Sequence, residues 1–131
     1  MELAELLALR VPAEALGLDE ARYDAVRAYA VSEAQQAAVT VTDATLNAQA
    51  VQAHALATLL RLELEHLRRA YSGGSGPDGS FSMAELSARM AELKAEIARQ
   101  EGILSGIIPP VTVTPAGATR ASGSQKIVYE A

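Results

Sequence analysis

A long seam of apolar residues between positions 44 and 71 most constrains what this chain can fold into. Its members recur three or four positions apart, the spacing that places them on one face of a single helix; they are Leu46, Ala50, Ala53, Ala57, Leu60, Leu64, Leu67 and Tyr71. Leu56, Leu59 and Leu62 widen this face beyond the seam of a two-stranded coiled coil. We therefore expect this helix to contact more than one neighbour.

A second apolar seam follows on residues 83–104 and matches the first one. Its members, again three and four positions apart, are Met83, Leu86, Met90, Leu93 and Ile97. Ser82 and Glu85 have the spacing of a capping box, which predicts that the helix begins there. Residues 72–80, between the seams, are rich in glycine and predict a flexible loop. The two seams together predict an antiparallel helical hairpin.

The N-terminal third of the chain predicts two further helices. A short one covers residues 2–9 and ends before Pro12 and Gly17, which break the chain. Asp19 is a suitable N-cap for the next helix, which extends to about residue 39. Its narrow apolar face consists of Tyr23, Val26, Ala30, Ala34 and Ala37. The β-branched residues 39–42 predict an extended connector to the long helix.

The segment 107–131 has no helical period and predicts an extended C-terminal arm. It contains two strand-like stretches, residues 111–114 and 126–129. Apolar residues at the end of such a segment cannot bury themselves, so we expect the arm to pair with another chain. The residues expected to bind that partner are Val111, Val113, Ile127, Val128 and Tyr129.

These elements predict an all-α fold, a helical bundle built on the long hairpin, with one helical domain over residues 1–106. A chain of 131 residues lies within the range of a single domain. Its core would consist largely of alanine and leucine, with one Phe and no Trp. Because small side chains bury little apolar area, an isolated subunit would be only marginally stable. Association into a homo-oligomer would supply further contacts.

Charge and composition exclude several classes of function. The net charge of −5 has the wrong sign for tight nucleic-acid binding, and Arg61, Arg68 and Arg69 alternate with glutamates. An acidic protein can still surround DNA that passes by without specific binding. The absence of cysteine excludes thiolate chemistry and predicts an intracellular setting. No export signal and no apolar run long enough to span a membrane is visible.

The sequence shows no constellation of residues for catalysis, a metal or a cofactor. His54 and His66 are twelve positions apart on one predicted helix, too far to share a metal ion. The carboxylate pairs Glu92 with Glu96 and Glu63 with Glu65 have basic neighbours, which is typical of charge patterning on a helix surface. We therefore expect no enzymatic activity and no cofactor.

The order of these elements resembles small virion proteins of tailed bacteriophages. The opening residues 2–7, followed by Gly-Leu-Asp-Glu-Ala-Arg at 17–22 and an alanine-rich helix, look like the beginning of head-tail connector, or adaptor, proteins. Residues 79–86 leading into 93–97 are similar to the loop and helix of head-completion proteins. The second match covers about thirty residues, and no catalytic residue comes with it.

The resemblance implies a structural virion protein that assembles as a ring on the portal vertex. Such a ring would extend the DNA channel and dock the next tail component, with the portal and a tail-side protein as partners. The alternative from another class is a cytoplasmic helical hairpin that oligomerises as a scaffold or regulatory module. The two hypotheses differ in whether the portal recruits the protein.

Overall fold

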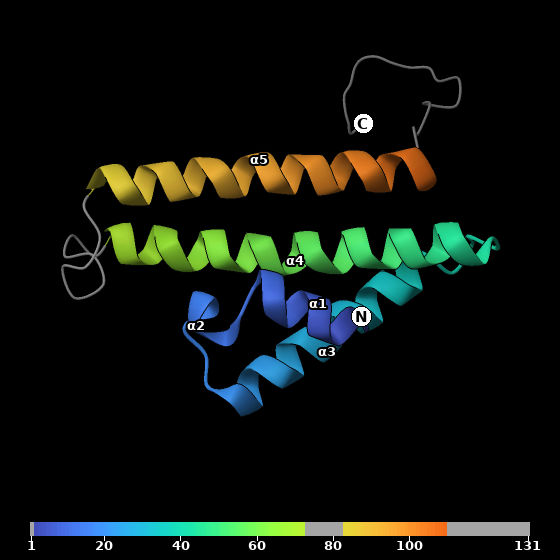
Figure 1. The fold of residues 1–131 in the computed structure, drawn as a ribbon, viewed down its shortest axis with the longest axis horizontal. Coiled ribbons are helices and arrows are strands. Elements are labelled where there is room, and N and C mark those ends of the chain that lie inside the picture. Colours follow the sequence, from blue (N-terminus) through green and yellow to red (C-terminus); the bar gives the residue numbers. More distant parts are fainter. Residues whose placement is uncertain (1, 73–82, 110–131) are drawn as a thin grey trace, which may run out of the picture.

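The computed structural model describes residues 2–72 and 83–109, and within these ranges the protein is entirely helical (Figure 1). The helices are α1 (Leu3–Arg10), α2 (Ala13–Leu16), α3 (Glu20–Ala37), α4 (Ala44–Ser72) and α5 (Met83–Ile107). Helix α4 lies in the middle, with α5 on one side and α1, α2 and α3 on the other (Figure 1). The prediction of an all-α helical bundle is confirmed.

The single turn α2 was not predicted, and its boundary residues explain it. Pro12 is its N-cap, and Gly17 ends it in the left-handed conformation with a φ of 66°. A backbone bond of 3.2 Å from the Leu18 amide to the Ala13 carbonyl closes this end. Proline and glycine therefore bound a short helix here, whereas the sequence suggested only a break in the chain.

Helix α3 begins where the sequence predicted. The Asp19 side chain accepts a hydrogen bond of 2.8 Å from the Arg22 amide, which confirms the N-cap. The buried phenol of Tyr23 donates to the Val11 carbonyl at 2.5 Å and so fixes α3 against the end of α1.

The C-terminal end of α3 differs from the prediction. Ala37 is exposed, and Ala38, just beyond the helix, is buried instead. The β-branched stretch 39–42 begins as a turn, closed by a 2.9 Å bond from the Val41 amide to the Ala38 carbonyl. The Asn47 carboxamide donates to both of these residues' carbonyls, at 2.9 Å to Ala38 and 3.2 Å to Val41. This side chain, rather than β propensity, sets the connector's shape.

Helices α4 and α5 lie side by side and run in opposite directions (Figure 1). Most of the predicted seam residues are buried in the core, where α4 packs against α5 on one side and against α3 on the other. They are Ala50, Ala53, Ala57, Leu60, Leu64, Leu67, Leu86, Leu93 and Ile97. The apolar face of α4 is also wider than a two-helix seam, as predicted, because Leu56 and Leu59 are fully buried. Helix α4 thus has neighbours on two sides, as its breadth of apolar residues predicted.

Three apolar residues of α4 and α5 that were predicted to lie on buried faces are exposed. Leu46 is 44% exposed in the first turn of α4, and Met83 is 59% exposed at the first residue of α5. Each lies at a helix end, where the described neighbours no longer cover the seam. Leu62 is 41% exposed. The loop 72–80 and the Ser82 cap lie outside the described residues, apart from Ser72, which ends α4.

Candidate functional site

The outer face of α5 carries a regular row of small residues. The row, which we call the outer seam, consists of Ala84, Ala88, Ala91, Ala95, Ala98 and Gly102, all of them exposed. Spacings that alternate between four and three keep these residues on one face, and 100° per residue places that face opposite Leu93, which packs against α4. A Cβ added at Gly102 would meet no atom within 4 Å. The outer seam is therefore open to a second helix.

Helix α5 is buried on one side only. Its core residues pack against α4, and it reaches the other layer chiefly through an ion pair with Arg10 of α1. Two large apolar side chains, Met83 and Ile103, stand exposed on either flank of the outer seam, at 59% and 41%. A surface helix normally presents charged residues on the face away from the core. The small side chains of the outer seam are instead suited to close helix packing, and the exposed charged residues Glu92, Lys94 and Arg99 border them.

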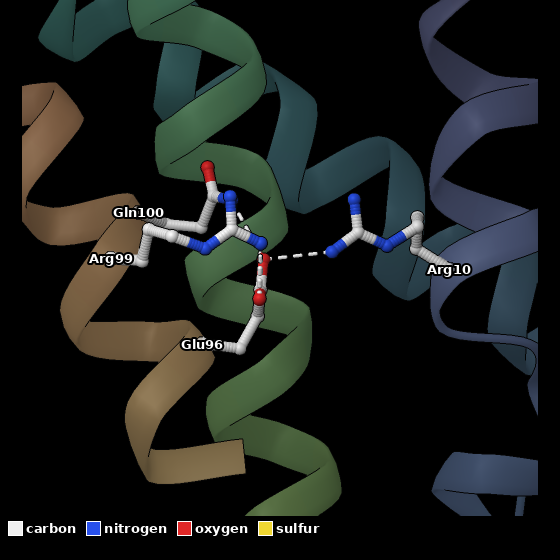
Figure 2. A network of polar contacts seen from close by, with 4 residues as sticks. All are labelled: Arg10, Glu96, Arg99 and Gln100. Carbon is white, nitrogen blue, oxygen red and sulfur yellow. Dashed lines mark hydrogen bonds and ion pairs between the residues drawn. The ribbon is translucent and has the colours of Figure 1, made fainter. Parts of the chain in front are cut away.

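A polar network joins α1 to α5 around Glu96 (Figure 2). The Glu96 carboxylate accepts from Arg10 at 2.7 Å, from Gln100 at 2.9 Å and also from Arg99. The Arg99 hydrogen bond, followed by those of Gln100 and Arg10, outweighs partial burial and lowers the pKa of Glu96 to about 2. The carboxylate therefore stays ionised at neutral pH and holds the two layers together.

An ion pair between a buried glutamate and a half-exposed arginine joins α4 to α5. The Glu63 side chain is only 6% exposed, and its Oε2 accepts from Arg89 Nη2 at 2.8 Å and from Arg89 Nε at 3.1 Å. Arg89 also donates to Glu92 at 3.3 Å. Burial opposes the charge on Arg89, but the bonds to both glutamates outweigh it and raise the pKa of the guanidinium. The other oxygen of Glu63, Oε1, is buried without a hydrogen-bond partner.

This burial corrects the expectation that Glu63 belongs to the surface. Glu63 lies on the α5 side of α4, where only its charge partner makes burial tolerable. Glu65 is exposed as expected. Two of the three arginines considered for phosphate contact have carboxylate neighbours, because Arg61 pairs with Glu101 and Arg68 lies 4.0 Å from Glu65.

A groove of about 400 Å³ lies where α1, α3 and the beginning of α4 meet. Its lining consists of Leu3, Leu6, Gln35, Asn47, Ala48, Val51 and Gln52. None of these side chains is ionisable. A second hollow of about 260 Å³, between Arg10 and α5, is lined by Arg10, Leu60, Arg89, Glu92, Leu93 and Glu96. The first groove therefore suits a neutral, partly apolar ligand, and the second is occupied by charge pairs.

The two histidines do not come together. His66 is partly buried rather than solvated, and its ring lies against Gly17, where an added Cβ would approach Cε1 to 2.5 Å. His54 has a buried Nδ1 without a hydrogen-bond partner. Within residues 2–72 and 83–109, no group of three or more His, Asp or Glu side chains could hold a metal ion.

The residues predicted to bind a partner, Val111, Val113, Ile127, Val128 and Tyr129, lie outside the described residues. The arm was predicted to begin at residue 107, but α5 includes Ile107, and the described chain ends at Pro109. Whether the arm binds a partner therefore stays a prediction.

Sequence reasoning missed the outer seam, although its signal was present. The apolar period of residues 83–104 marks only the face that packs against α4, and the outer seam lies half a turn away from it. Those positions hold alanine or glycine from 84 to 102 without a charged residue. The buried Glu63 had a weaker signal, since nothing local separates it from the exposed Glu65.

Comparison with models of protein families gave no match for this chain, and comparison with curated proteins and with solved structures gave none either. Among the described helices, none is both long and apolar enough to cross a membrane.

Proposed function

We propose that this protein is a structural virion component, a head-tail connector that forms a ring on the portal vertex of a tailed bacteriophage. In this role it extends the DNA channel and docks the next tail component. The observation that carries the assembly part of the proposal is the one-sided burial of α5. Its outer seam and the exposed Met83 and Ile103 present a helix face that suits a neighbouring subunit.

The connector role rests on the sequence resemblance together with charge. The order of short helix, acidic break, alanine-rich helix, long helix and extended arm is similar to that of connector proteins. A net charge of −5 fits a wall that lets DNA slide past, because repulsion of phosphates prevents tight binding. Arginines paired with carboxylates, such as Arg61 with Glu101, support the same conclusion.

The test measures particle mass with and without purified portal protein. We expect a ring-sized assembly that the portal recruits. Ala95→Glu, which puts a charge in the middle of the outer seam, should abolish the assembly without loss of helicity. Ala25→Glu, at an exposed position of α3, is the matched control and should assemble normally.

Each result separates the hypotheses. Assembly that ignores the portal would favour the cytoplasmic scaffold over the connector. A monomer under all conditions would contradict both. Assembly that survives Ala95→Glu would show that the outer seam is not the subunit contact.

A further inference from the structure

The charged residues that border the outer seam of α5 form a pattern that a second copy of the same helix complements. Glu92 and Arg99 lie on one border of the seam, and Lys94 and Glu101 lie on the other. On each border an acidic and a basic residue are seven positions apart, which is about 10.5 Å along the axis. The acidic residue comes first on one border and second on the other.

Two outer seams can pack along most of α5 when the helices are antiparallel. If Ala95 lies opposite Ala98 of a second copy, then Ala91 lies opposite Gly102, and only small side chains meet along the contact. Residues 86–107 of the two helices then overlap, which is about 33 Å of helix. Small side chains allow the two axes to approach to about 8 Å.

This register brings opposite charges together on both borders. Glu92 faces Arg99 of the second copy, and Lys94 faces Glu101 of that copy. Because the arrangement has two-fold symmetry, each of these attractions occurs twice. No like-charge pair faces another across the contact among these four residues.

Other arrangements of the two seams bring like charges together. A shift by one heptad sets Glu92 against Glu92 and Lys94 against Lys94 of the second copy, which cancels its gain of Glu85 opposite Arg99. A parallel pair in register places Lys94 beside Arg99 on both sides. The bordering charges therefore select one antiparallel register and identify a second copy of this chain as the occupant.

The four side chains are free to reach across such a contact. Lys94 is exposed and has no ion pair with another described residue. Glu101 pairs with Arg61 and is still 49% exposed. Glu92 and Arg99 are 70% and 61% exposed, and each has its ion-pair partner only on α5 itself.

We propose that two copies of this chain pair through their outer seams, antiparallel and with Ala95 of one opposite Ala98 of the other. A two-fold contact closes on itself and does not extend into a ring. The pair is therefore the form in which the free protein keeps its outer seam covered until the portal is present. Alanine and glycine bury little apolar area, so the contact is weak enough to open. This role of the pair rests on the proposed function.

Reversing the charge of Lys94 tests the register. Sedimentation of the full chain without portal protein gives the dissociation constant of the dimer. In Lys94→Glu both contacts of this residue become repulsive, so we expect the dissociation constant to rise by at least about tenfold. Arg69→Glu, at an exposed position of α4, changes the net charge equally and is the matched control.

A mixture of two variants restores the complementarity. Glu101→Lys should weaken the dimer of its own kind as Lys94→Glu does. When the two variants are mixed, every contact on this border joins opposite charges again, so the mixed dimer should form within about threefold of the wild-type dissociation constant.

Three results would overturn the proposal: a wild-type chain that stays monomeric up to about 1 mM, a Lys94→Glu variant that dimerises like the control, or a mixture no tighter than its components. Repeating the measurement with portal protein separates this inference from the proposed function. A ring on the portal without a free dimer leaves the connector function standing and overturns the pairing. A dimer that the portal never recruits supports the pairing and contradicts the connector function.

Discussion

Replacing Arg89 by methionine tests whether the Arg89 guanidinium compensates the buried negative charge of Glu63. The substitution keeps most of the side-chain volume but leaves the Glu63 carboxylate, 6% exposed, without its guanidinium. Loss of one partner of a buried pair costs about 3–5 kcal/mol. Arg89 is itself 41% exposed, so the lower end of this range applies, and we expect a loss of about 3 kcal/mol in the free energy of unfolding.

Thermal unfolding followed by circular dichroism measures this loss. For a domain of this size, about 3 kcal/mol lowers Tm by roughly 10–20 °C. The double variant Glu63→Met/Arg89→Met removes both charges and should recover to within about 1 kcal/mol of the wild type. Arg22→Met, at an exposed pair with Asp19, is the control and should change stability by less than about 0.5 kcal/mol. A Tm for Arg89→Met within 2 °C of that control would refute the reasoning.

Three other substitutions give separate tests. Gly17→Ala should lower the free energy of unfolding, measured by urea denaturation, by about 2 kcal/mol, because φ is positive there and the new Cβ meets His66. This loss should be smaller in a His66→Ala background, and an unchanged loss would exclude the contact. Glu96→Gln should lose about 1–2 kcal/mol above pH 5, and the difference from wild type should vanish as the pH falls from 4.5 toward 2, since the pKa of about 2 favours the folded carboxylate. Leu93→Asp should abolish the helical signal, whereas Lys94→Asp next to it should leave that signal unchanged, because Leu93 is 1% exposed and Lys94 is exposed.

The helices could be predicted from the sequence because their signals are local. Apolar residues three and four apart identified α4 and α5, and the Asp19 cap fixed the beginning of α3. Where the seams end was harder to predict. Leu46 continues the period of α4 yet is exposed, since its burial depends on whether a neighbour extends that far.

The polar contacts between different helices could not be predicted, because each joins residues far apart in the chain. Arg10 and Glu96 are separated by 86 positions, and Glu63 and Arg89 by 26. Nothing near Glu63 distinguishes it from Glu65, and only the arrival of α5 decides which of them is buried. The outer seam, in contrast, could have been predicted from the spacing of alanine and glycine in the sequence.

Helix α4 is shared by two layers, and this limits which residues it can accept. Ala50, Ala53, Ala55 and Ala57 are all at most 2% exposed, in the half of the helix that lies between α3 and α5. A larger side chain there has no solvent to turn toward and would displace a neighbouring helix. The alanines of the outer seam of α5 have free space around them instead, so they should tolerate larger substitutions than the alanines of α4. We therefore expect substitutions of these α4 alanines by larger residues to destabilise the fold more than the same substitutions in the outer seam.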